Sequence, residues 1–215
     1  MNSIRDFFDF INKECNYVVL RNWDNIFTSS VYVKGHEDID ILCDDLRTFI
    51  KVTNAQRVHK NKYKDNFIIS IGGNDVRFDI RHVGDGYYPE SWEEEMLNNR
   101  SLNQESVYII SQEDYVYSLS YHALFQKNKV SSDYLNKLKT AFLSFNQKII
   151  TSERELLKEL SDYCSNKAYQ FEIPTDPGVV INWNNIRAIK TKYNAWRLSL
   201  RGVIRSYDKI MRHFR

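Results

Sequence analysis

Two aspartates, Asp38 and Asp40, alternate with isoleucines in the segment GHEDIDIL. On a β-strand successive side chains point to opposite faces, so both carboxylates share one face while Ile39 and Ile41 share the other. Carboxylates about 7 Å apart on one strand face repel each other unless a cation lies between them. Mg²⁺ suits this place, because it prefers oxygen ligands and is commonly held by one or two carboxylates together with substrate phosphates.

A third acid, Asp79, lies in the segment RFDI, where Phe78 and Ile80 are expected to face a core. Three acids on adjacent strands can hold two metal ions, one activating a hydroxyl and the other steadying a triphosphate. The alternative is that Asp38 and Asp40 are solvated acids near a turn, although aspartate is disfavoured in strands. Asp79 taken alone could be structural, and its interest comes from the other two acids.

The stretch YVVLRNW…GHEDIDILCDD…VRFDIRHV, within residues 17–85, resembles the nucleotidyltransferase-fold superfamily, the polymerase-beta-like group. That family has a glycine-containing turn, then an acid-hydrophobic-acid strand, then a third acid on a later strand. The resemblance implies that Asp38 and Asp40 are ligands of Mg²⁺ or Mn²⁺. It further implies that Asp79 is the third carboxylate and a candidate general base. Gly35 and His36, in the turn before the acids, become candidate phosphate contacts.

One departure from the family pattern lies after the first strand. The family usually has Gly-Gly or Gly-Ser there, and this chain has Leu20, Arg21, Asn22 and Trp23. Arg21 and Asn22 are candidates to bind phosphate in place of that turn, because arginine offers a bidentate fork. The alternatives are that triphosphate binding is altered or lost, and that Arg21 forms an ion pair with a nearby acid.

Possible acceptor-side groups follow in the segment YYPESW, which begins at Tyr87, and in a later segment that contains His122 and Lys127. This layout resembles, loosely and to about residue 135, small nucleotidyltransferase-like proteins of bacterial and viral glycan-assembly genes. The resemblance implies transfer from a nucleotide-activated donor to a hydroxyl of a sugar, polyol or glycan. His122 lies within an amphipathic helical pattern, which is more typical of a hydrogen-bonded packing histidine.

The elements that must position these residues are mixed in the first half of the chain. We expect an amphipathic helix over 3–14, strands near 17–20, 31–34 and 38–43, and a helix over 45–54. A hairpin is predicted from 67–71 and 76–83, which flank the turn Gly72-Gly73-Asn74-Asp75. Asp75 itself is interpreted as a turn residue.

Helical patterns dominate after about residue 90. Helices are predicted from 112 to 127 and from 132 to 145, after the capping box that begins at Ser152, and near 184–213. The fold class is therefore α+β. A nucleotidyltransferase-like domain is expected over 1–100 and a helical domain over 101–215, with a soft boundary between 85 and 110.

Charge is distributed unevenly along the 215 residues. The segment 187–215 holds nine lysines and arginines against one acid, whereas residues 1–186 hold 21 basic and 27 acidic residues. Arg197, Arg201, Arg205 and Lys209 lie at i, i+4 spacing beside an apolar side that includes Trp196. This pattern indicates either an amphipathic helix docked on an acidic N-terminal domain or a surface for an anion. An anionic glycan, a lipid headgroup or membrane surface, and nucleic acid all remain open.

Composition excludes several classes of protein. The three cysteines are Cys15, Cys43 and Cys164, whose spacing predicts neither a disulfide framework nor a zinc site. The N-terminal segment mixes charges into its apolar residues, and no apolar run approaches a membrane span, so we expect a cytoplasmic chain. Three functions compete: a metal-dependent transferase acting on a glycan-type hydroxyl, one acting on RNA or a protein, and a non-catalytic module that binds a nucleotide or partner.

Overall fold

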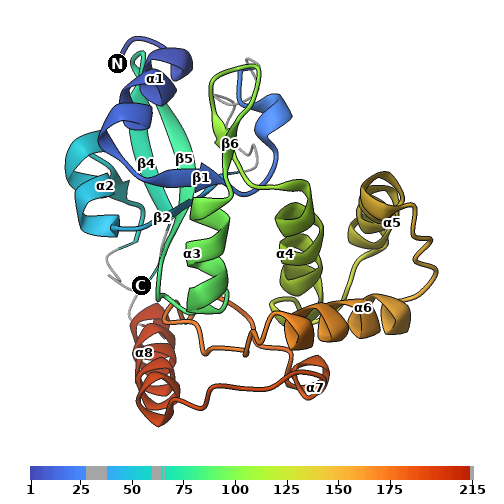
Figure 1. Cartoon of the computed structure of the whole chain (residues 1–215). Coiled ribbons are helices and arrows are strands. Elements are labelled where there is room, and N and C mark those ends of the chain that lie inside the picture. Colours follow the sequence, from blue (N-terminus) through green and yellow to red (C-terminus); the bar gives the residue numbers. More distant parts are fainter. Residues whose placement is uncertain (28–37, 60–63, 65, 214–215) are drawn as a thin grey trace. The chain divides into compact units, whose positions relative to one another are not determined.

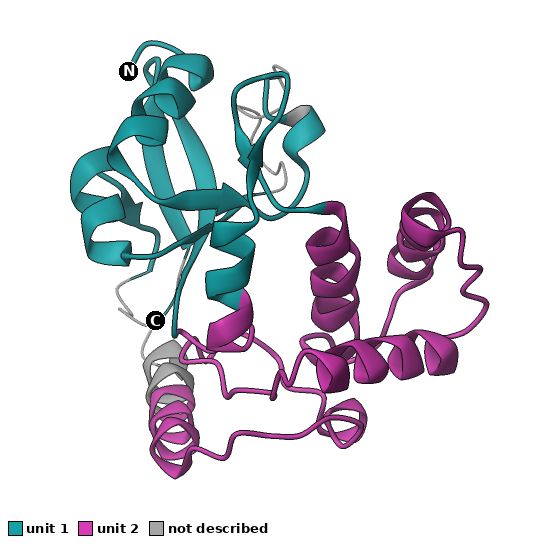
Figure 2. Cartoon of the chain, viewed as in Figure 1, with its two compact units in different colours: residues 1–84, 93–111 teal, residues 85–92, 112–215 magenta. Residues whose placement is uncertain are grey.

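The structure is a computed structural model that describes residues 1–27, 38–59, 64 and 66–213, with side chains described for all of these except 25 and 207–213. Within them the chain is mixed α/β, with a seven-stranded mixed sheet and eight α-helices, in agreement with the expected α+β class. Two compact units are present (Figure 2). The first contains residues 1–84 and 93–111, and the second contains residues 85–92 and 112–215.

The sheet belongs to the first unit and has the strand order β3-β4-β5-β2-β1-β7-β6 (Figure 1). Its central strand β2 is parallel to β5 and antiparallel to β1, and β1 is parallel to β7. The strands are β1 (Tyr17–Val19), β2 (Ile39–Cys43), β3 (Gln56–Arg57), β4 (Asn66–Ile71), β5 (Asn74–His82), β6 (Ser101–Leu102) and β7 (Tyr108–Ile109). The short strands β6 and β7 lie at one edge of the sheet and were not predicted.

The predicted hairpin is confirmed as β4 and β5, paired antiparallel from Ile71 and Asn74 at the turn. Gly72 and Gly73 occupy left-handed conformations, with φ of +59° and +78°. A side chain at Gly72 would place its Cβ 2.5 Å from the carbonyl oxygen of Asn2. The turn therefore requires glycine both for its backbone and for its close approach to the N-terminal segment.

One face of the sheet is apolar and is covered by α1 (Ile4–Glu14) and α2 (Leu46–Thr53). Phe7 of α1 packs against Phe78 of β5, with ring centroids 5.3 Å apart. Helix α1 begins as predicted, because the Ser3 hydroxyl accepts a hydrogen bond from the Asp6 amide at 3.1 Å. Ile39 and Ile41 of β2 belong to this core, so the intervening residues of β2 face the other side of the sheet.

The second unit is built from α4 to α8 around stacked aromatic rings. Tyr117 and Tyr163 lie face to face with centroids 3.8 Å apart, and Trp92 stacks on Tyr169 at 5.1 Å. The high aromatic content of the sequence thus supplies this core. The helices not yet given are α3 (Glu90–Asn98), α4 (Gln112–Phe125), α5 (Ser132–Asn146), α6 (Glu153–Asn166), α7 (Trp183–Ile186) and α8 (Ala195–His213).

The helix starts predicted from capping residues in this unit are confirmed. The Ser152 hydroxyl accepts a hydrogen bond from the amide of Glu155, and the Ser131 hydroxyl caps α5 in the same way. The Glu155 carboxylate also accepts hydrogen bonds from the amide and hydroxyl of Thr151, at 2.8 and 2.7 Å.

The prediction of a single C-terminal helix near 184–213 is wrong for the first part of that range. Residues 187–194 separate α7 from α8, and their backbone pairs with Phe171. The Phe171 amide donates to the Lys190 carbonyl at 2.7 Å, and the Lys192 amide donates to the Phe171 carbonyl at 2.8 Å. These backbone groups bond to a segment about twenty residues away, so they are not available for helical hydrogen bonds.

Candidate functional site

Asp40 and Asp79 are register partners on the neighbouring parallel strands β2 and β5 (Figure 1). The flanking pairs, Ile39 with Phe78 and Ile41 with Ile80, point into the apolar core on the opposite face. Side-chain alternation therefore directs both carboxylates to the face of these two strands that lies opposite the apolar core. The sequence prediction that these two acids lie on adjacent strands is confirmed.

Asp38 lies one residue before the start of β2 and is partly buried. Burial raises the pKa of its carboxyl group above the ordinary value, the charge of Asp40 raises it further, and Arg77 partly opposes both effects. The effect of Asp40 agrees with the two carboxylates sharing one face. Bringing like charges together is costly, and a cation nearby would remove that cost.

Arg21 holds Asp40 with both arms of its guanidinium group. Its Nε donates to Oδ2 at 3.1 Å and its Nη2 donates to Oδ1 at 2.7 Å. The two side chains are only 8% and 15% exposed. The chain reaches this position because the Leu20 amide donates to the Asp40 carbonyl at 2.9 Å, which ties the segment after β1 to β2. The alternative of an ion pair with a nearby acid is thus the arrangement found for Arg21.

Asn22 follows in a left-handed conformation, with φ of 59°, and caps the short 3₁₀ helix Trp23–Asn25. Asparagine is among the few residues that adopt this conformation readily. Its presence after Arg21 lets the chain turn sharply away from the sheet, and no contact described for it tests its predicted role in phosphate binding.

Arg81 is a second arginine at the site and was not predicted. Its Nη2 lies 2.9 Å from the Asp79 carboxylate, and the two residues share a face because they are two apart on β5. Burial raises the pKa of Asp79 from 3.8 to about 6, Arg81 opposes this shift, and Asp40 adds to it. The alternation in the segment FDIRH was the sequence signal that could have revealed Arg81.

The site can be compared with a divalent-cation site in the chemical type of its donor groups and in the positions of their side chains. Asp38, Asp40 and Asp79 offer carboxylate oxygens, the kind of donor that Mg²⁺ prefers. In the described residues, however, no three acidic, histidine or cysteine side chains converge closely enough to hold a metal ion. Asp40 and Asp79 instead bind Arg21 and Arg81. The donor set therefore fits Mg²⁺ in chemical type, but in this structure its side chains are not placed to hold the ion.

The remaining predicted site residues lie elsewhere. Gly35 and His36 fall outside the described residues. Lys127 belongs to the second unit, where its Nζ lies 5.9 Å from the ring centroid of Tyr134. His122 is buried, and its Nδ1 lies 2.8 Å from the Tyr87 hydroxyl. His122 is thus a hydrogen-bonded packing residue, in agreement with its helical pattern.

The arginines of the C-terminal helix contact the segment 172–179 of their own unit. Arg201 is 3% exposed and donates to the carbonyls of Pro174 and Val179 at 2.8 and 2.6 Å, and also to that of Asp176. Burial lowers the pKa of Arg201 to about 10, so its guanidinium group remains charged at neutral pH. Of the basic face predicted from the i, i+4 spacing, Arg201 is therefore buried against carbonyl groups of its own unit and not against an acidic surface. The side chain of Lys209 is not described.

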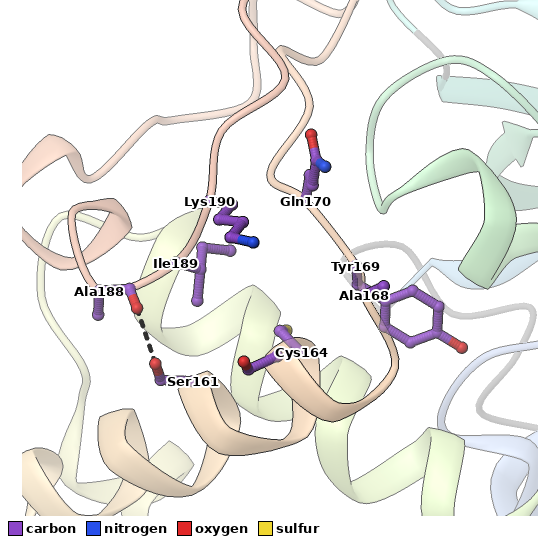
Figure 3. Close-up of a pocket in the computed structure, with 9 residues that line it drawn as sticks. Ser161, Cys164, Ala168, Tyr169, Gln170, Ala188, Ile189 and Lys190 are labelled. Atoms are coloured by element: carbon purple, nitrogen blue, oxygen red, sulfur yellow. Dashed lines mark hydrogen bonds between the residues drawn. The ribbon is translucent and has the colours of Figure 1, made fainter.

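A cavity of about 180 Å³ lies in the second unit, between α6 and the segment 188–190 (Figure 3). The Ser161 hydroxyl on its wall donates to the Ala188 carbonyl at 2.7 Å. Burial raises the pKa of Cys164 to about 12, so this thiol stays protonated at neutral pH and is a poor nucleophile. The lining contains none of the residues predicted from the sequence, and its groups indicate no particular chemistry.

Comparisons of the chain with protein-family models, with curated proteins and with solved structures found no match. Among the helices that the structure describes, none is long and apolar enough to cross a membrane. The argument for function therefore rests on the geometry of the acidic site.

Proposed function

We propose that this chain is a metal-dependent nucleotidyl- or phosphoryl-type transferase, which moves a unit from a nucleotide-activated donor to a hydroxyl of a sugar, polyol or glycan. The observation that carries the proposal is the register of Asp40 with Asp79 on β2 and β5. Adjacent strands are about 5 Å apart, so two carboxylates in register lie within reach of one cation or one phosphate group. Asp38, one residue before β2, is the third carboxylate in the proposal.

In this proposal Asp38, Asp40 and Asp79 hold Mg²⁺ or Mn²⁺, which when bound would neutralise charge on the donor phosphates. Asp79 also takes the proton of the attacking hydroxyl. The hydroxyl oxygen forms the new bond to phosphorus as the bond to the leaving phosphate breaks.

Arg21 gives the site a way to open without leaving buried charges unpaired. A buried carboxylate that loses its only partner is strongly destabilised. A donor that arrives with its cation brings a positive charge for Asp40 and a phosphate for Arg21. Asp40 can then exchange Arg21 for the cation while Arg21 exchanges Asp40 for the phosphate. The bidentate fork of arginine suits the phosphate oxygens.

The first experiment measures thermal unfolding with Mg²⁺ or Mn²⁺ and each of ATP, CTP, GTP and UTP. A donor at 100 times its dissociation constant is expected to stabilise the wild type by about 2.7 kcal/mol. The Asp40→Asn variant should lose this effect. The Asp75→Asn variant should keep it, because it removes an exposed carboxylate at the start of β5, where Asp75 pairs with Ser70 and is not the turn residue that the sequence suggested. A chain that no metal–nucleotide combination stabilises would contradict the proposal.

The second candidate function is a non-catalytic module that binds a nucleotide or a partner. The Arg21–Asp40 and Arg81–Asp79 ion pairs favour it, because they occupy carboxylates that a metal would need. Such a module would bind nucleotide equally well with Mg²⁺ or with EDTA and would turn over no donor. Metal-dependent release of pyrophosphate or of a nucleotide product in the presence of a polyol acceptor would exclude it.

A further inference from the structure

Helix α8 presents apolar side chains to solvent. Trp196 is 65% exposed and Val203 is 67% exposed, while Tyr193, just before the helix, is 75% exposed. Trp196, Leu200 and Val203 are spaced i, i+4 and i+7, so they form one stripe along the helix. A helix on the surface of a globular protein normally buries such a stripe, whereas here Trp196 and Val203 are exposed and Leu200 between them is partly buried.

Hydrogen bonds from arginines on the other side of α8 fix this orientation of the helix. Arg201 donates to the carbonyls of the segment 174–179, and Arg205 donates from its Nε to the Pro177 carbonyl at 3.2 Å. Arg197 donates to the Ile173 carbonyl at 3.1 Å. The polar side of α8 is therefore anchored to its own unit, and rolling the helix to bury Trp196 would break these bonds.

The exposed stripe lies in a segment of strong positive charge. Residues 187–206 contain six lysines and arginines and no acid. The carbonyl partners of Arg201 and Arg205 are neutral, and the nearby Asp176 carboxylate offsets part of the charge of Arg201. Glu172 pairs with Lys192 and Arg197, and Glu90 also pairs with Lys192. Arg187 and Lys190 are exposed just before the helix.

We propose that α8 lies on an anionic lipid surface, with the apolar stripe of Trp196, Leu200 and Val203 at the level of the headgroups. Tryptophan and tyrosine are favoured at that level, and basic residues add attraction to anionic lipids. A second copy of the chain docked through the same stripe would bring two positively charged segments together, and these would repel each other. A nucleic acid would match the charge but would leave Leu200 and Val203 in water. An anionic lipid surface satisfies both the stripe and the charge, and this inference is independent of the transferase proposal.

The test is flotation of the full chain with vesicles of phosphatidylcholine alone or mixed in equal parts with phosphatidylglycerol. Binding is expected to the mixed vesicles and to be weaker at about 0.5 M salt than at about 0.1 M, because salt screens the attraction. The double variant Trp196→Ser, Val203→Ser should bind about tenfold more weakly. The matched control is Ile149→Ser, which removes an apolar side chain that is 74% exposed outside this segment.

Several results would overturn the proposal. These are the absence of binding to the mixed vesicles, equal binding to pure phosphatidylcholine, and undiminished binding of the double variant. Unfolding midpoints measured in parallel establish that the variants are folded. If sedimentation shows a wild-type dimer that the double variant loses, or if the stripe is needed to bind single-stranded RNA, the occupant is a second copy or a nucleic acid and the lipid proposal is wrong.

Discussion

Arginine is used differently in the two units. In the first unit Arg21 and Arg81 bind carboxylates on the face of the sheet opposite α1 and α2. In the second unit Arg201 is buried against carbonyl oxygens. A carboxylate partner can be exchanged for a phosphate when a cation takes the arginine's place, whereas backbone carbonyls are fixed by the fold. The first arrangement is therefore suited to a binding site, and the second is suited to holding a helix.

The largest effect on stability is expected at Arg201. The Arg201→Met change leaves buried carbonyls without their donor, and we expect it to lower the free energy of unfolding by about 3 kcal/mol. Arg187→Met, at an exposed position, should change it by less than about 0.5 kcal/mol. Urea unfolding measures both. A loss below about 1 kcal/mol at Arg201 would mean that water replaces the guanidinium group and that α8 is not anchored by it.

The next largest effect is the dependence of the free energy of unfolding on pH that the Asp79 carboxyl group causes. Its folded pKa, about 6, lies above the 3.8 of the unfolded chain, so the folded state retains its proton when the unfolded state has lost it. The free energy of unfolding should therefore fall as pH rises from about 4 to about 6, by at most about 3 kcal/mol. Urea unfolding at several pH values measures this slope. Asp79→Asn should remove it and Asp75→Asn should keep it, and an unchanged slope in Asp79→Asn would refute the assignment.

A smaller effect is expected from coupling between Arg21 and Asp40. Each single change, Arg21→Met or Asp40→Asn, leaves a largely buried polar partner without its bond. The double variant should be more stable than the sum of the single effects by about 1–2 kcal/mol. A double-mutant cycle on unfolding free energies measures this coupling. Strict additivity would show that the pair is not formed in solution.

The smallest effect compares helix caps in the two units. Ser3→Ala removes the cap of α1, and Ser152→Ala removes the cap of α6. Each should lower the free energy of unfolding by about 1 kcal/mol. If calorimetry resolves separate transitions, each change should lower only the transition of its own unit. Matched shifts of both transitions in both variants would show that the units unfold together.

Local features of the fold were predictable from the sequence. The start of α1 at Ser3, the β4–β5 hairpin and the strand that contains Asp40 all follow from residues close together in the chain. A cap, a glycine turn and an alternating pattern each depend on neighbours within a few positions. The break at residues 187–194 was missed because it depends on pairing with Phe171, which the local helical pattern cannot indicate.

The candidate site was predictable in part. The identity of Asp40 and Asp79, and their positions on neighbouring strands, could be inferred from alternation in two segments. The role of Arg21 was left between a phosphate contact and an ion pair, and the structure supplies the ion pair. Arg81 was missed, although its place two residues after Asp79 puts it on the same face.

The sequence by itself determined the α+β class, the strands that carry the acids and the positive charge of the last helix. Only the tertiary structure decided which partner each charged group has, and hence that Arg201 is buried while Trp196 is exposed. The physical reason is one of range. Periodicity and capping act between residues a few positions apart, whereas the partner of a guanidinium group depends on which distant backbone or carboxylate the fold brings beside it.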